Sequence, residues 1–138
     1  MTITTRKRTK RTTETDAVQG FTPPAIKEGE HYAGVLLGKD GAHGDHVILL
    51  PGEADSVTWE QAKAWAKKIG GELPTRREQS LLYANLQEQF KPAWSWSGEQ
   101  HAAYPACAWL QHFGYGYQDG FLKSDVYRAR AVRRLVIR

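Results

Sequence analysis

The segment from Pro92 to Tyr117 constrains the fold of this chain most, because aromatic residues crowd between glycines and prolines there. It contains three of the five tryptophans, three of the six tyrosines and two of the five histidines. Such a composition does not suit a long helix, and it predicts short strands joined by fixed loops. The rings can either pack in a core or bind a ligand. The position of each ring, on a strand or in a turn, indicates which of the two roles it has.

Two helices are predicted before this segment, and each has a clear beginning. Thr58 and Thr75 are good N-caps, and Gln61 and Glu78 follow three residues later as capping-box partners. Pro92 bars extension of the second helix. Apolar residues at three- and four-residue spacing predict the buried faces: Trp59, Ala62, Trp65, Ala66 and Ile69 in the first helix, and Leu82, Leu86 and Phe90 in the second.

Most of the remaining domain is predicted to form strands. Residues 32–38 and 46–50 are apolar runs on either side of a glycine-rich turn, which predicts a β-hairpin. After Pro92 we expect four further short strands, at about 94–97, 107–113, 116–122 and 127–137. Helices grouped in the first half beside a mainly antiparallel sheet predict an α+β domain.

The net charge of +4 is concentrated in an N-terminal arm. Residues 1–16 carry five basic and two acidic side chains, whereas the remaining chain carries fourteen and thirteen. Residues 1–20 have almost no apolar content, so we predict a disordered basic arm followed by one domain over 21–138. The nearly neutral domain argues against a broad nucleic-acid face. The basic residues of the arm are Arg6, Lys7, Arg8, Lys10 and Arg11. They could contact nucleic acid, an acidic partner or a membrane surface, or they could serve only to keep the chain soluble.

Metal, nucleophilic and phosphate-binding chemistry have little support in the sequence. His43 and His46 lie in a glycine-rich turn, and no second cluster completes a ligand shell, so we expect no metal and no cofactor. Cys107 stands between two alanines in a predicted strand, which is typical of a small buried hydrophobe. No glycine-rich loop joins a strand to a helix in the manner of a phosphate cradle. Nothing singles out an acid–base pair among the carboxylates Glu99, Asp119 and Asp125.

The aromatic segment divides into two groups. Trp94 and Trp96 alternate along one strand and point to the same face, which favours a role in the core. The second group lies in or beside turns, where tyrosine, histidine and glycine make adaptable recognition surfaces. For this second group binding and packing are equally supported; its members are His101, Tyr104, His112, Tyr115, Tyr117 and Phe121.

An ordered set of motifs resembles a known domain family over roughly residues 30–138. The motifs are Gly-Gly-Glu-Leu-Pro-Thr-Arg-Arg-Glu-Gln (70–79), Trp-Ser-Trp-Ser-Gly-Glu (94–99), Ala-Trp (108–109), Phe-Gly-Tyr-Gly-Tyr-Gln (113–118) and Arg-Ala-Arg-Ala-Val-Arg-Arg (128–134). The chain resembles phage and bacterial domains related to the C-terminal domain of the collagen-like adhesin Lcl. The resemblance implies a C-type-lectin-like fold, akin to formylglycine-generating enzymes and to variable proteins of diversity-generating retroelements. It also implies two helices beside short antiparallel sheets, with the first and last strands paired.

The resemblance further implies which residues would contact a ligand. Trp94, Trp96 and Trp109 resemble fixed core positions of the family. The calcium-binding motifs of sugar-binding C-type lectins and the cysteine pair of formylglycine-generating enzymes are both absent. Calcium-mediated sugar binding and that catalysis are therefore not expected. By analogy with the variable proteins, the contact face would consist of His101, Tyr104, Leu110, His112, Tyr115, Tyr117 and Phe121.

We therefore expect a non-enzymatic ligand-binding module, encoded by a phage or prophage, that recognises a protein or, less readily, a glycan. Host attachment and inhibition of a host protein are the two expected uses. No run of residues predicts a membrane span, and homo-oligomers are possible. The expected location is the cytoplasm of a bacterial host, or a phage particle. The alternative is a nucleic-acid-associated protein that uses the basic arm and the arginine-rich last strand.

Overall fold

The computed structural model describes residues 22–41 and 43–137. The predicted arm at residues 1–20, with its nucleic-acid candidates Arg6, Lys7, Arg8, Lys10 and Arg11, lies outside the described residues. In chain order the elements are β1 (His31–Leu37), β2 (Gly44–Leu49), β3 (Ala54–Val57), α1 (Trp59–Lys68), α2 (Arg76–Leu86), a short 3₁₀ helix (Gln87–Gln89), β4 (Trp94–Gln100), β5 (Cys107–His112), β6 (Gln118–Leu122), β7 (Tyr127–Ala129) and β8 (Val132–Ile137). The predicted α+β class is confirmed.

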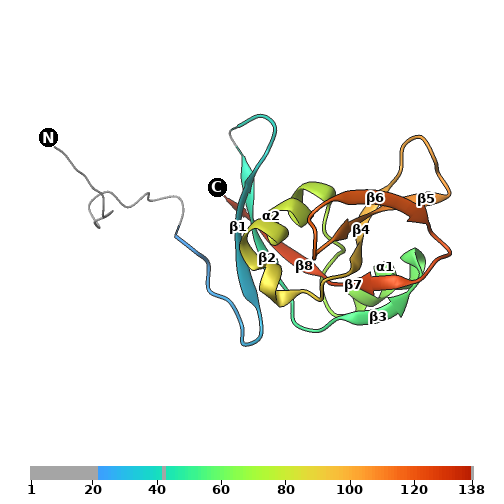
Figure 1. Ribbon diagram of the computed structural model, residues 1–138. Coiled ribbons are helices and arrows are strands. Elements are labelled where there is room, and N and C mark those ends of the chain that lie inside the picture. The colour runs from blue at the N-terminus through green and yellow to red at the C-terminus, as the bar shows by residue number, and fades with distance from the viewer. Residues whose placement is uncertain (1–21, 42, 138) are drawn as a thin grey trace, which may run out of the picture.

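The strands form two sheets (Figure 1), a smaller one in the order β1-β2-β8 and a larger one in the order β3-β7-β4-β5-β6. The expected pairing of the first and last strands is wrong, because β2 lies between β1 and β8 and pairs antiparallel with both. The larger sheet is not wholly antiparallel either, since β4 and β7 run parallel. The predicted strand at 127–137 is divided into β7 and β8, and it crosses from the larger sheet to the smaller one.

Both helices begin where the capping boxes predict. The Thr58 hydroxyl accepts from the Gln61 backbone N–H at 3.3 Å, and the Gln61 side chain accepts from the Thr58 N–H at 3.0 Å. Thr75 and Glu78 make the same pair of bonds at 3.1 and 2.9 Å. These bonds satisfy N–H groups that the first helical turn leaves without partners. The predicted helix starts are confirmed.

Each helix covers one sheet. Helix α1 buries Trp59, Ala62 and Ala66 against a core formed mainly by the larger sheet, whereas Ile69, expected on this buried face, is exposed. Helix α2 buries Leu82 against the smaller sheet, in a second core that includes Phe113. The first turn of α2 lies where the two sheets meet, because Glu78 pairs with Arg134 of β8 and Arg76 bonds to Glu99 of β4 and Gln118 of β6.

Trp96 is the largest fully buried side chain of the first core. Its indole Nε1 donates a 2.8 Å hydrogen bond to the carbonyl of Val57, so the one polar atom of the ring is satisfied. Trp59 makes the equivalent bond to the carbonyl of Ser97, also at 2.8 Å. The first bond joins β4 to the end of β3, and the second joins the start of α1 to β4. Together they hold the helix against the larger sheet.

The arginines of the last strand are occupied within the fold. Arg130 is buried and donates to the carbonyls of Leu50 and Gln89. The other three pair with carboxylates: Arg128 with Glu53 and Asp55, Arg133 with Glu30, and Arg134 with Glu78 and Glu72. Arg130 lies at the break between β7 and β8.

The Glu30 pair makes a testable contribution to stability. Hydrogen bonds from Arg133 and from the Lys27 N–H lower the pKa of the Glu30 carboxyl from 4.5 to about 2. Because the pKa is lower in the folded protein, the carboxylate stabilises the fold above pH 4.5, and this contribution is lost as the pH falls toward 2. Glu30→Gln should lower the free energy of unfolding at pH 7 by about 1–3 kcal/mol.

Urea unfolding at a series of pH values checks this expectation. The difference between wild type and Glu30→Gln should shrink steadily below pH 4.5. The neighbouring and exposed Glu28 provides a matched control, and Glu28→Gln should leave the unfolding midpoint unchanged. A difference that stays constant down to pH 2 would show that the Glu30 charge does not carry the effect.

Candidate functional site

The hairpin of β5 and β6 positions most of the predicted contact residues. Paired residues in this hairpin share a face, as with Ala108 and Phe121, or Leu110 and Asp119. Since side chains alternate along a strand, Leu110 and His112 face one side of the sheet and Trp109 faces the other. The residues predicted as one contact face are therefore separated into two groups on opposite faces of the sheet. The His101 loop precedes β5, and the His112 turn follows it.

The larger group forms a run of touching rings that we call the aromatic ridge. Tyr115 and Tyr117 lie nearly parallel, with 7° between their planes and 6.0 Å between ring centroids. His112 stacks on Tyr115 with 4.7 Å between ring centroids, and it makes an edge-to-face contact with Trp94 at 5.0 Å. Through Phe121 the contacts continue to a last ring, and the ridge as a whole consists of Trp94, His112, Tyr115, Tyr117, Phe121 and Tyr127.

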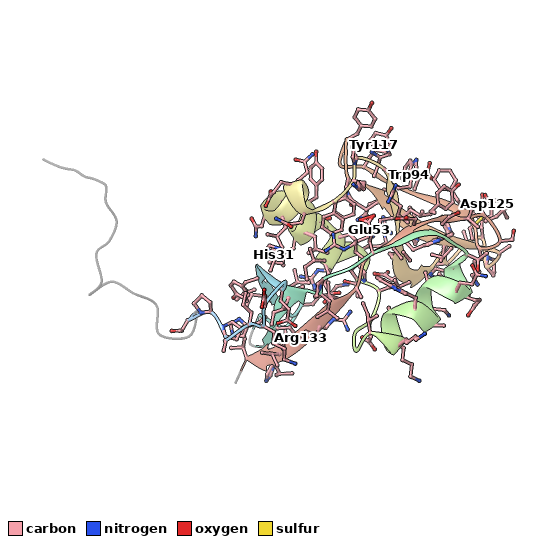
Figure 2. The ribbon with its side chains drawn as sticks, turned by 90° about the horizontal axis from the view of Figure 1, so that it is seen from below. His31, Glu53, Trp94, Tyr117, Asp125 and Arg133 are labelled. Atoms are coloured by element: carbon pink, nitrogen blue, oxygen red, sulfur yellow. The ribbon has the colours of Figure 1, made fainter. Side chains whose placement is uncertain are left out.

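Two rings of the ridge reach far into solvent. Tyr115 is 73 % exposed and Tyr117 is 56 % exposed, whereas the other four rings are half-buried. Figure 2 shows Tyr117 projecting from the same side of the molecule as Trp94, away from His31 and Arg133. Burial, and secondarily the charge of Asp125, raise the pKa of the Tyr127 phenol above its ordinary value.

The turn that carries the two exposed tyrosines is fixed by its own hydrogen bonds. His112 Nδ1 accepts from the N–H groups of Gly114 and Tyr115, at 3.0 and 3.2 Å. A neutral imidazole whose Nδ1 accepts carries its proton on Nε2, so the tautomer is defined. Gly116 has a φ of 92°, and a Cβ there would lie 2.8 Å from the Tyr83 ring. Only glycine fits this turn without strain.

His101 and Tyr104 form the smaller group, in the loop between β4 and β5. His101 Nδ1 accepts from the N–H groups of Ala103 and Tyr104, at 3.1 and 3.2 Å. Its ring stacks on Trp109 with 4.6 Å between centroids, and Tyr104 is 65 % exposed beside it. The loop thus repeats the geometry of the His112 turn. The sequence signal for both is His-x-x-Tyr, which occurs at 101–104 and at 112–115 and was not recognised from the sequence.

The expectations for several individual residues change. The contact role expected for Leu110 is wrong, because its side chain is fully buried in the first core beside Trp96. Trp109, expected in the core, is half-buried and lies beneath the guanidinium of Arg76, 3.5 Å from its carbon atom. Cys107, expected to be buried, is also half-buried. Trp94, also expected in the core, is half-buried and packs against Tyr117 within the ridge.

The nucleic-acid alternative loses part of its basis. It required free arginines on the last strand, but Arg128, Arg133 and Arg134 hold carboxylates of the same chain. A guanidinium that is already paired has little to offer a phosphate. Of the two basic segments that this alternative used, the arm remains, and it lies outside the described residues.

Among residues 22–41 and 43–137, no three His, Cys, Asp or Glu side chains gather as a metal site would require. His43 instead pairs with Asp40, with 2.7 Å between Nδ1 and Oδ2. No helix in this part of the chain has the length and apolar character needed to cross a membrane. A comparison of the sequence with protein-family models and with curated proteins finds no match.

Proposed function

We propose that this protein is a non-enzymatic ligand-binding module that recognises a protein partner through the aromatic ridge. The observation that supports this most is the exposure of Tyr115 and Tyr117 on a turn with a fixed backbone. Tyrosine offers a large, rigid and amphipathic contact area and loses little conformational entropy on binding. Aromatic side chains of this kind supply much of the energy at protein interfaces.

The packing of Trp94 within the ridge strengthens this proposal. Trp94 makes edge-to-face contacts with His112 and Tyr117, at 5.0 and 5.6 Å between ring centroids. The two exposed rings are therefore held in place before a partner arrives, which lowers the entropic cost of association. A glycan is the less favoured ligand, because the calcium-binding motifs of sugar-binding C-type lectins are absent from the sequence.

We further propose that the domain is C-type-lectin-like, as the family resemblance implies. Two helices beside two sheets of short strands support this assignment, as does the loop-rich region that begins at Trp94. The pairing of β8 with β2 is a departure from the expected pattern. In a phage or prophage setting, such a module would serve host attachment or the inhibition of a host protein.

Affinity capture from a bacterial lysate tests the proposal. The intact chain should recover a partner, and Tyr115→Ala/Tyr117→Ala should lose it, with affinity for the purified partner reduced by more than about 100-fold. Tyr104→Ala is the matched control, because Tyr104 is similarly exposed but lies at the other end of β5. Equal recovery by all three proteins, or no recovery by any, would contradict the role of the ridge.

A further inference from the structure

Arg76 is held in one position by neighbours that leave its outer edge open. Its guanidinium carbon lies 3.5 Å from the centroid of the Trp109 ring, and its Nε donates to Gln118 Oε1 at 2.9 Å. Gln118 Nε2 in turn donates to the Arg76 carbonyl and to Gln111 Oε1, each at 2.9 Å. The stack fixes the plane of the guanidinium, and the Nε bond fixes its rotation.

The two terminal Nη groups of Arg76 have no acceptor among residues 22–41 and 43–137. This distinguishes Arg76 from the other arginines of the described chain, whose terminal nitrogens bond to carboxylates or carbonyls: Arg77, Arg128, Arg130, Arg133 and Arg134. A guanidinium offers four N–H donors on its two Nη atoms, and a pair of parallel donors matches the oxygens of a carboxylate or phosphate.

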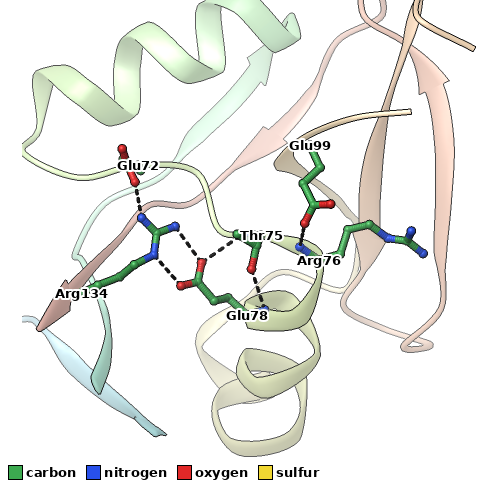
Figure 3. Close-up of polar contacts among 6 residues, drawn as sticks. All are labelled: Glu72, Thr75, Arg76, Glu78, Glu99 and Arg134. Carbon is green, nitrogen blue, oxygen red and sulfur yellow. Dashed lines mark hydrogen bonds and ion pairs between the residues drawn. The ribbon is translucent and has the colours of Figure 1, made fainter. Parts of the chain in front are cut away.

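Glu99 comes near Arg76 but does not occupy this edge. Its Oε2 accepts from the Arg76 backbone N–H at 2.7 Å, at the start of α2. Figure 3 shows this bond, and it shows the Arg76 guanidinium directed away from Glu99 and from the Arg134–Glu78 pair. The first N–H of the helix is therefore already satisfied, so the open receptor is the guanidinium and not the helix terminus.

Arg76 and Gln118 also line a cleft of about 590 Å³ between the β1–β2 hairpin and the first turn of α2. Lys39 and Arg77 contribute two more positive charges to its wall, and Asp45 and Glu99 contribute two negative ones. Arg134 and Glu78, which also line it, neutralise each other. The cleft thus keeps one excess positive charge, and Arg76 forms part of its wall.

We propose that Arg76 is a preorganised receptor for one oxyanion, a carboxylate or a phosphate group, on a ligand that enters this cleft. The two Nη donors bind two oxygens of the group, while Trp109 shields the opposite face of the guanidinium from water. A preorganised fork loses little side-chain entropy when the oxyanion binds. This site is separate from the aromatic ridge, because Trp109 and His112 lie on opposite faces of the larger sheet.

NMR titration of the ¹⁵N-labelled full chain with acetate, benzoate and inorganic phosphate, at constant ionic strength, tests this proposal. The Arg76 Nε–Hε and Trp109 Nε1–H signals should shift and saturate at roughly millimolar concentrations of the preferred anion. A preference for acetate and benzoate would identify the ligand group as a carboxylate, and a preference for phosphate would identify it as a phosphate.

Arg76→Lys keeps the charge but removes the fork, so it should weaken the Trp109 response by roughly tenfold. Lys68→Ala, a charge change on the exposed end of α1, should leave the titration unchanged. Tyr115→Ala/Tyr117→Ala should also leave it unchanged, which keeps this test independent of the ridge. Signals of the wild type that do not saturate with any of the three anions, or an equal response in Arg76→Lys, would overturn the proposal.

Discussion

Replacing Trp96 by alanine should lower the free energy of unfolding by about 3–5 kcal/mol. The side chain is fully buried between α1 and the larger sheet, so its removal leaves a large cavity in the first core. The substitution also leaves the Val57 carbonyl without its 2.8 Å hydrogen bond. In addition Tyr127 loses the ring that it meets edge to face at 5.3 Å, which loosens one end of the aromatic ridge.

Urea unfolding followed by circular dichroism measures this change. Trp96→Phe is the informative control, because it keeps most of the ring volume and removes the indole N–H; it should cost about 1–2 kcal/mol. A loss below about 1 kcal/mol for Trp96→Ala would mean that the core collapses around the site and that Trp96 does not organise it.

Replacing Arg134 by methionine should be equally damaging, at about 3–5 kcal/mol. Glu78 keeps only 4 % of its side chain exposed, and Arg134 binds both of its carboxylate oxygens through Nε and Nη2. The substitution leaves a buried carboxylate without a counter-charge. Since Arg134 belongs to β8 and Glu78 to α2, the pair also joins the smaller sheet to the helix that carries Arg76.

A second substitution separates the lost charge pair from general damage. Glu78→Gln removes the negative charge but can still accept from the Thr75 N–H, as the capping box requires. The double variant Arg134→Met/Glu78→Gln should therefore recover more than half of the stability lost in Arg134→Met, measured by the same urea unfolding. No recovery in the double variant would show that the packing of the arginine stem, and not the stranded carboxylate, accounts for the loss.

The helices were predictable because their signals are local. Thr58 and Thr75 each have their capping partner three residues away, so the whole motif can be read from a short window. Strand β3 was missed because Ala54–Val57 is short and lacks an apolar alternation. It forms through its pairing with β7, whose paired residues lie 70 and 75 positions later in the chain, and no local sequence pattern indicates that contact.

The break in the last strand had no local signal either. The residues from Ala129 to Val132 are all buried, so alternation fails where the chain leaves one sheet for the other. The buried Arg130 depends on the Leu50 and Gln89 carbonyls, which are distant in sequence. The strand pairing was wrong for a related reason: apolar patterns identify the strands of a sheet but not their order.

For the candidate site, residue type and turn position were enough to single out Tyr115 and Tyr117. They were not enough to show that His101 and Tyr104 lie apart from these two tyrosines. The six-residue strand β5 separates the two loops, and the loops lie on opposite faces of the larger sheet. Leu110 shows the same limit, since alternation along β5 carries it into the core. Arg76 was overlooked because its neighbours Trp109 and Gln118 come from another part of the chain.

The placement of β7 between β3 and β4 also governs when this domain can fold. Strand β3 has no sheet partner among the described strands except β7, and β2 lacks its second neighbour until β8 is present. During synthesis on a ribosome, neither sheet can therefore be completed before residues 127–137 have emerged. Such late, long-range closure slows folding and prolongs exposure of unpaired strand edges. We expect nascent chains that stop before Tyr127 to remain protease-sensitive, and those that include β8 to become protected in one step.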